Sequence, residues 1–226
     1  AAMDTKAKDF RILWDNAYCV HHLTDEELTI KNIIRECEKF GNPDRVFEFA
    51  STSKITFPGG GVAVCASSKK NIKWLTDHML LPLKSGDKIN QLRHQLFLKD
   101  LSGVREHMKK HKAIIKPKFD LIDRILHEEL DEWEVAKWTN PKGGYFINLE
   151  LQQGMASRVW ELCREGGVRV TPAGSTFPYG NDSEDKYLRL APTYLSISEL
   201  ETAMKLLCLA IKIAYYEKNT EVCIEN

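Results

Sequence analysis

Short apolar runs alternate with helical segments over the first third of the chain. Runs with strand character occupy 11–14, 45–50 and 61–66, while 30–40 and 71–79 carry apolar residues at helical spacing. A strand–helix–strand order of this kind is typical of a parallel sheet in an α/β protein. The sequence therefore predicts an α/β fold that begins with a mostly parallel sheet.

The rest of the chain predicts a second, smaller α/β unit. A long helical segment covers 88–112 and is weakest at Gly103, and Pro117 begins a fresh helix that reaches about Leu130. Four strands and one helix are then expected, in the order 135–138, 145–149, 155–165 (the helix), 168–171 and 187–190.

The last helix is expected to begin with a capping box. Ser198 and Glu201 have the spacing of that motif, and the tail after Glu217 carries no helical period. Two lobes and a linking helix follow from the whole pattern. These three regions are expected at 1–85, 86–115 (the helix) and 116–226.

Charge and composition exclude several classes of function. The chain has 226 residues, with 32 Lys and Arg against 32 Asp and Glu, so its net charge does not favour nucleic acid or an acidic membrane. No apolar run approaches the ~18 residues that a membrane-spanning helix needs. The six cysteines form no C-x-x-C pair and fit free thiols in a reducing cytoplasm. We expect a cytoplasmic protein that binds neither nucleic acid nor membrane.

The segment EFASTSKITFPGGGVAV places one lysine between a hydroxyl cluster and a glycine turn. Lys54 follows Ser51 and Ser53 and precedes three glycines at 59–61. One interpretation is a solvated surface lysine. The other is a lysine that forms a Schiff base, beside hydroxyls and glycine amides that hold a phosphate. The second arrangement would suit a phosphorylated aldehyde cofactor.

Asp15 ends the first predicted strand, in the segment WDNAY. Ligands of open α/β sheets bind beyond the carboxyl ends of the strands. Asp15 could there keep a ring nitrogen protonated, and Tyr18 could donate to a phenolate oxygen. The alternative is an aspartate that caps its loop and a tyrosine that packs.

Arg189 interrupts the apolar strand 187–191. A buried arginine usually has a carboxylate partner, which can be internal or belong to a substrate.

His107 and His111, four residues apart, have a spacing that could bind metal. Because no third ligand is apparent, we expect these two histidines on a solvated helix face.

Four motifs occur in a fixed order: DNAY at 15–18, STSK at 51–54, GGYF at 143–146 and RLAP at 189–192. Together they resemble the fold type I pyridoxal-phosphate aminotransferases, in the aspartate aminotransferase-like group of classes I and II. The resemblance covers nearly the whole chain but only about the C-terminal half of the family. It implies the C-terminal part of the large cofactor-binding domain and the smaller α/β C-terminal domain, joined by a long helix.

The resemblance implies a role for each residue of the first two motifs. Lys54 would form the internal aldimine with pyridoxal 5'-phosphate and then move a proton between the substrate α-carbon and the cofactor. Asp15 would pair with the pyridinium nitrogen and keep the ring an electron sink. Tyr18 would bond the phenolate oxygen of the ring.

Further roles are implied for the phosphate and the substrate. Ser51 and Ser53 would contact the phosphate, and Arg189 would bind the substrate α-carboxylate, whereas GGYF is expected to be structural. Family members carry an arginine for the phosphate in the turn after the lysine, but residues 59–62 here read GGGV. Backbone amides are expected to take over part of that task.

The implied function is transfer of an amino group between an amino acid, with aspartate as the first guess, and a 2-keto acid. The abrupt start before the strand at 11–14 indicates a fragment, inactive alone, of a protein that works as a dimer. Three alternatives stay open. They are a related pyridoxal-phosphate lyase or decarboxylase, the effector-binding domain of a transcription regulator, and a structural fragment that binds no cofactor.

Overall fold

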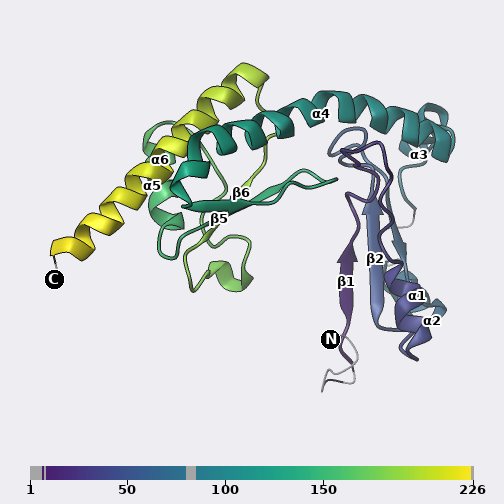
Figure 1. The fold of residues 1–226 in the computed structure, drawn as a ribbon. Helices are drawn as coiled ribbons and strands as arrows, with labels where there is room; N and C mark the ends of the chain where they lie inside the picture. Colours follow the sequence, from purple (N-terminus) through teal and green to yellow (C-terminus); the bar gives the residue numbers. More distant parts are fainter. Residues whose placement is uncertain (1–6, 8, 80–84, 225–226) are drawn as a thin grey trace. The chain divides into compact units, whose positions relative to one another are not determined.

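The computed structural model describes residue 7 and residues 9–79 and 85–224 (Figure 1). The chain forms two compact units, Ala1–Lys110 and His111–Asn226, and the boundary lies inside helix α4 (Leu101–Leu130). Each unit combines helices with a three-stranded sheet. The α/β class predicted from the sequence is therefore confirmed.

The first unit is built around strand β2, which lies between the other two strands. Its elements besides the start of α4 are β1 (Ile12–Asp15), α1 (Ile33–Lys39), β2 (Val46–Ser51), β3 (Ala63–Ala66), α2 (Lys69–Met79) and α3 (Lys88–Leu98). β1 pairs with β2 in parallel, with Ile12 opposite Val46 and Asp15 opposite Phe49. β3 pairs with β2 antiparallel, because the connection 52–62 is too short for the crossover that a parallel pair requires.

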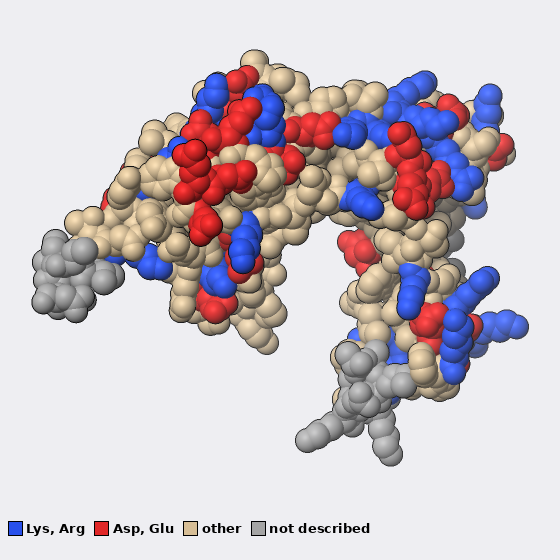
Figure 2. Space-filling model, viewed as in Figure 1, with Lys and Arg blue, Asp and Glu red and all other residues tan. Residues whose placement is uncertain are grey.

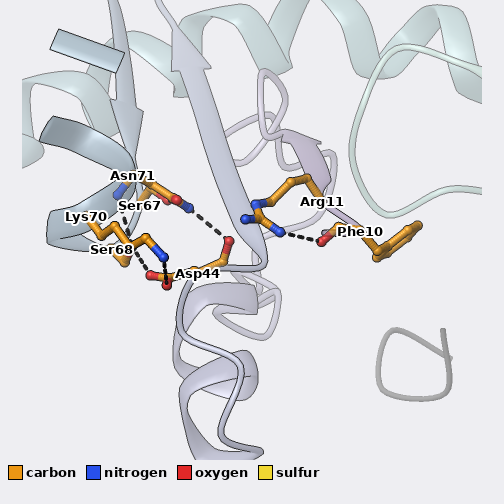
Figure 3. A network of polar contacts seen from close by, with 7 residues as sticks. All are labelled: Phe10, Arg11, Asp44, Ser67, Ser68, Lys70 and Asn71. Carbon is orange, nitrogen blue, oxygen red and sulfur yellow. Dashed lines mark hydrogen bonds and ion pairs between the residues drawn. The ribbon is translucent and has the colours of Figure 1, made fainter. Parts of the chain in front are cut away.

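A polar network fixes the start of β2 against the start of α2 (Figure 3). The Asp44 carboxylate accepts from the Ser68 hydroxyl, and this hydrogen bond holds the pKa of Asp44 below its usual range. The Asn71 amide donates to the Asp44 carbonyl and to the Ser67 hydroxyl, both at 2.9 Å. The Ser67 hydroxyl in turn donates to the Val46 carbonyl. The position of β2 along the sheet is thus set by side chains as well as by its strand neighbours.

The segment 88–112 is helical as predicted, but it breaks between α3 and α4 at Lys99, so the weak point predicted at Gly103 is wrong. Lys99 adopts a positive φ of 61°, and the Asp100 carboxylate caps α4 by accepting the Gly103 N–H at 2.9 Å. The break therefore precedes the predicted weak point. A Cβ at Gly103 would lie 1.9 Å from the Leu98 carbonyl oxygen, so this glycine permits the close approach of the two helices.

Pro117 lies inside α4 rather than at the start of a new helix, so that prediction is also wrong. A proline within a helix removes one backbone hydrogen bond. Residues on both sides of it nevertheless share one buried face, formed by Ile115, Phe119, Ile122 and Leu126. Packing of this face outweighs the local preference and carries the helix through the proline.

The second unit is an antiparallel sheet covered by helices. Its elements are β4 (Ala136–Trp138), β5 (Ile147–Leu151), β6 (Tyr187–Leu190), α5 (Ala156–Glu165), α6 (Ile197–Ile224) and the 3₁₀ turns η1 (Asp131–Trp133) and η2 (Pro178–Gly180). β5 lies between β4 and β6. Its alternate residues Ile147, Leu149 and Leu151 are all buried. This period of two identifies the face that α5 and α6 cover (Figure 1).

The strand predicted at 168–171 is wrong, since this described segment joins no sheet. Its polar backbone groups bond to α5 instead. The Val168 N–H donates to the Cys163 carbonyl at 2.8 Å, and the Trp160 indole donates to the Val170 carbonyl at 3.3 Å. An apolar run can therefore pack extended along a helix without a strand neighbour.

Helix α6 begins and ends differently from the prediction. The capping box consists of Ser196 and Glu199, two residues before the predicted pair, with the Ser196 N–H donating to the Glu199 carboxylate at 2.9 Å. The helix also continues past Glu217, where regular structure was not expected. Arg158 on α5 donates two hydrogen bonds to the Glu217 carboxylate, at 2.7 and 2.8 Å, and so connects this last part of α6 to α5.

The surface carries both signs of charge. Blue and red side chains lie side by side on the face drawn in Figure 2, in keeping with the equal numbers of acidic and basic residues. Among the helices that the structure describes, none combines the length and apolar character needed to cross a bilayer.

The buried face of β5 should dominate the stability of the second unit. Leu149 is fully buried, and Leu149→Ala should lower the free energy of unfolding by about 2–5 kcal/mol, because it leaves a cavity in the core. Leu209→Ala is the matched control, since Leu209 is 57% exposed. Urea unfolding followed by circular dichroism measures both. Equal losses for the two variants would contradict this description of the core.

Candidate active site

The parallel pairing of β1 and β2 brings two chain segments to one edge of the first sheet. The Asn16 N–H donates to the Phe49 carbonyl at 2.7 Å, immediately beyond the paired residues. The segment after β1 carries Asp15 and Tyr18, and the segment after β2 carries Lys54. The structure therefore places these three sequence-predicted residues at the same edge of one unit.

Asp15 is exposed at this edge and is oriented by its own loop. One carboxylate oxygen accepts the Ala17 N–H at 3.0 Å. This hydrogen bond is the loop cap considered from the sequence, and the exposed carboxylate can still accept from a ligand. Tyr18 is half-buried, and its ring meets the His21 ring edge to face at 5.3 Å. Backbone and ring contacts thus hold both side chains in place.

Lys54 lies on a tight turn directly after β2. The N–H groups of Ile55 and Thr56 both donate to the Thr52 carbonyl at 2.9 Å, which winds the chain into a single helical turn. The Lys54 side chain is exposed on this turn, whereas Ser53 is half-buried beside it. The backbone around the lysine is therefore ordered by hydrogen bonds even though the residue is exposed.

The glycine turn folds back against the hydroxyl cluster. The Thr52 N–H donates to the Val62 carbonyl, and the Val62 N–H donates to the Thr52 hydroxyl, both at 2.9 Å. A Cβ on Gly61 would lie 3.2 Å from the hydroxyl oxygens of Ser53 and Thr52, so any side chain there would crowd them. The Ser51 hydroxyl accepts the Ser53 N–H at 3.4 Å. Hydroxyls and backbone amides thus gather beside Lys54, as an anion site needs.

Two histidines contact the carbonyls of the lysine turn. Nε2 of His21 lies 3.1 Å from the Lys54 carbonyl oxygen, and Nε2 of His107 lies 2.8 Å from the Ile55 carbonyl oxygen. The predicted solvated position of His107 is therefore wrong. Within the described part of the chain, no group of three His, Cys, Asp or Glu is placed to hold a metal ion.

A third histidine, on α3, contacts the hydroxyls of the turn. Nε2 of His94 is 2.9 Å from the Thr56 hydroxyl and 3.1 Å from the Thr52 hydroxyl. Nδ1 of the same ring is 2.9 Å from the Asn90 carbonyl. His94 is only 8% exposed. Neither His94 nor His21 belongs to a recognisable motif, so sequence reasoning missed both.

Arg189 lies in the second unit, on β6 opposite Asn148 of β5. Its guanidinium stacks on the Phe146 ring at 4.6 Å, so the GGYF motif supplies one wall of its surroundings. Nε of Arg189 is buried without a hydrogen-bond partner, and no carboxylate among the described residues pairs with this arginine. The internal partner considered from the sequence is therefore not found in that part of the chain.

A small hollow of about 110 Å³ adjoins Arg189 in the second unit. Thr171 and Met204 are among its lining residues. The strand that carries Arg189 is anchored by Asp182, whose carboxylate accepts the N–H groups of Lys186 at 2.8 Å and Tyr187 at 3.0 Å. Burial raises the pKa of Asp182, but these backbone bonds outweigh it and lower the pKa overall. Arg189 therefore projects from a well-anchored strand.

Comparison with known proteins gives concordant results. The chain matches the aspartate aminotransferase family over residues 1–222. The aspartate aminotransferase of Corynebacterium glutamicum is 46% identical over 217 residues, which are 96% of this chain and 50% of that protein. The crystal structure of an aspartate transaminase from the same species superposes with a TM-score of 0.92 at 46% identity, covering 96% of this chain and 51% of the other.

A more distant structure shares the fold alone. It is the α-aminoadipate aminotransferase of Thermus thermophilus in complex with N-(5'-phosphopyridoxyl)-L-leucine, with a TM-score of 0.75 at 22% identity. It covers 91% of this chain, which spans 51% of that structure.

The fold and these likenesses define the class as the C-terminal half of a fold type I aminotransferase. The chain belongs to the aspartate aminotransferase family, which confirms the resemblance seen in its four motifs. It spans about half the length of the curated relatives it matches.

Closure of the glycine turn should depend on the Thr52 hydroxyl. Thr52→Val keeps the shape of the side chain but removes the acceptor of the Val62 N–H, so the free energy of unfolding should fall by about 1–3 kcal/mol. Hydrogen exchange at the Val62 amide should accelerate. Thr76→Val is the control, because Thr76 is exposed and its hydroxyl donates to the Ile72 carbonyl of its own helix. An unchanged exchange rate at Val62 would refute this role of Thr52.

Proposed function

We propose that the full-length protein is a pyridoxal-phosphate-dependent aminotransferase, which moves an amino group between an amino acid and a 2-keto acid. The observation that carries this proposal is the position of Lys54 at the sheet edge that also bears Asp15. Membership of the aspartate aminotransferase family supports it. Aspartate is the first substrate to test, because the relative that is 46% identical is an aspartate aminotransferase.

The side chains at this edge suit pyridoxal phosphate. An exposed amine matches its aldehyde, a carboxylate matches its ring nitrogen, and the hydroxyls of Ser51 and Ser53 beside Gly61 match its phosphate. When bound, this cofactor supplies an electron-withdrawing ring that stabilises negative charge at the substrate α-carbon. Without the arginine usual in the family, backbone amides of the glycine turn take part of the phosphate charge.

Lys54 is the catalytic residue of this proposal. Its Nζ would hold the cofactor, and once the substrate amine had displaced it, the free amine would take the proton from the substrate α-carbon as a base and give it back as an acid. Asp15 keeps the ring nitrogen protonated by a charge-assisted hydrogen bond. Tyr18 donates to the phenolate oxygen and fixes the tilt of the ring. Each role needs a fixed direction, which the hydrogen-bonded loops described above supply.

Arg189 binds the α-carboxylate of the substrate. Its Nε lacks a protein partner among the described residues, and a carboxylate would satisfy this buried donor while forming a two-pronged pair with the guanidinium. Stacking on Phe146 limits the rotation of the guanidinium plane. A planar guanidinium with an unpaired N–H donor at Nε is suited to bind a planar carboxylate.

The same proposal covers the organisation of the protein. Residues 1–85 are a remnant of the large cofactor-binding domain, 86–115 form the linking region, and 116–226 form the small domain. The protein acts in the cytoplasm as a homodimer and binds neither nucleic acid nor membrane, in keeping with its balanced charge.

Lys54→Ala should abolish both cofactor attachment and activity. In the full-length protein with pyridoxal phosphate, borohydride reduction followed by peptide mass mapping should find the cofactor on Lys54 in the wild type and on no specific residue in the variant. Aspartate–2-oxoglutarate turnover should fall by about 10²–10⁴-fold, the usual contribution of an acid–base group. Lys73→Ala, on exposed α2, is the control. Specific labelling of another lysine would overturn the proposal, and turnover without a keto acid would indicate a lyase.

Arg189→Lys should weaken substrate binding without removing the charge. Loss of the fork should raise KM for the amino acid about 10- to 100-fold, from the ~1.5–3 kcal/mol that a hydrogen bond to a charged group contributes. Arg124→Lys is the matched control, because Arg124 pairs with Glu128 on the exposed side of α4. Steady-state kinetics of full-length variants measure both. An unchanged KM in Arg189→Lys would exclude Arg189 as the carboxylate ligand.

A further inference from the structure

The turn that bears Lys54 leaves two carbonyl groups outside its own hydrogen bonding. Within the turn, the Thr52 carbonyl accepts from the N–H groups of Ile55 and Thr56. The carbonyls of Lys54 and Ile55 come two and three residues later. Each of these carbonyls accepts instead from an imidazole of a distant segment, at 3.1 Å for His21 and 2.8 Å for His107.

The three histidines reach the turn from three different elements. His21 follows β1, His94 lies on α3 and His107 lies on α4. They are 33, 42 and 52 residues distant in sequence from the groups that they contact at Lys54, Thr52 and Ile55. Three of the seven histidines in the chain thus hold one five-residue turn.

The partners of these rings define their tautomers. A carbonyl oxygen only accepts, so Nε2 of His21 and Nε2 of His107 must each carry a proton. Nδ1 of His94 faces the Asn90 carbonyl and must also carry a proton. Nε2 of a neutral His94 is then an acceptor for the hydroxyl of Thr52 or Thr56. The rings therefore have different tautomers, each required by a specific acceptor.

Packing holds each imidazole in its orientation. His21 is 4% exposed and meets the Tyr18 ring at 5.3 Å, and His107 meets the Phe97 ring at 5.1 Å. His94 lies 6.1 Å from the Phe57 ring. Rings packed in this way lose little further entropy when they bond, which makes them suitable supports for a backbone.

We propose that His21, His94 and His107 are positioning residues for the reaction and act as a three-point clamp on the lysine turn. His21 and His107 hold its backbone at two carbonyls, and His94 holds its two threonine hydroxyls. The clamp sets the direction in which the Lys54 amine leaves the sheet edge. His21 has a second effect, because it lies three residues after Tyr18 and so ties the segment of Asp15 and Tyr18 to the lysine turn. This proposal rests on the proposed function, in which Lys54 is the catalytic amine.

Removal of one donor tests the clamp directly. His107→Leu and His21→Leu keep apolar bulk but lose the N–H, whereas His107→Gln and His21→Gln keep a side-chain N–H of similar reach. In the full-length protein the Leu variants should lose about 10- to 100-fold in kcat with KM changed less than about twofold, as expected for a displaced reacting group. The Gln variants should recover most of kcat.

His78→Leu is the matched control, because Nδ1 of this exposed histidine contacts only the Trp74 carbonyl of its own helix among hydrogen bonds in the described structure. It should keep the wild-type kcat. The clamp is overturned if the Leu variants keep kcat, or if folded Gln variants are as slow as the Leu variants. Borohydride labelling of wild-type Lys54 separates the two proposals: a labelled wild type with unaffected variants refutes the clamp alone, and an unlabelled wild type refutes the proposed function.

A measurement on the wild-type protein covers the case in which the Leu variants do not fold. Nitrogen-15 spectra of histidine-labelled full-length protein report which ring nitrogen carries the proton. We expect a protonated Nε2 in His21 and His107 and a protonated Nδ1 in His94. An unprotonated Nε2 in either His21 or His107 would overturn the clamp, since that ring could not donate to its carbonyl.

Discussion

The parallel pairing of β1 with β2 is the constraint on which the site depends. Because the two strands run in the same direction, Asp15 and Ser51 end at the same edge, and the Asn16 N–H closes the pairing on the Phe49 carbonyl at 2.7 Å. An antiparallel arrangement would send the two segments to opposite ends of the sheet. The network around Asp44 strengthens the constraint, because it fixes where β2 starts and therefore where Lys54 follows. The register of β1 against β2 thus determines where the residues that follow these strands are placed.

The sequence predicted the α/β class better than it predicted the local breaks. Asp15 and Lys54 could be predicted as site residues because each lies at the end of an apolar strand and each belongs to a motif. The break at Lys99 was missed because it depends on a positive φ and a local cap by Asp100, for which the sequence carries no glycine signal. The helix through Pro117 was missed because it depends on packing of its buried face. His21 and His94 were missed because their partners are 33 and 42 residues away, and no local period marks them. Local sequence patterns cannot reveal contacts between residues so far apart in the chain.

The second unit illustrates the balance between stability and binding. Leaving Nε of Arg189 buried without an acceptor costs free energy of folding, of about 1–3 kcal/mol for a typical buried polar group. The surroundings offset that cost through stacking on Phe146, the Asp182 bonds that anchor β6 and the buried leucines of the sheet. A carboxylate ligand would recover the unmade bond when it binds. An unpaired Nε of this kind would lower the stability of the protein without a ligand and would strengthen the binding of a carboxylate.

The glycine turn has a consequence for the order in which the molecule assembles. Residues 52–62 close on themselves through the paired bonds of Thr52 and Val62, so this short loop pays little entropy to form. The imidazoles that orient it arrive from segments up to 52 residues away, and loops of that length close later. The turn would therefore form early as a small, correctly shaped but undirected unit. With the histidine clamp, the lysine would acquire a fixed direction only when α3 and α4 have docked, so the orientation of this side chain would be among the last features set as the chain folds.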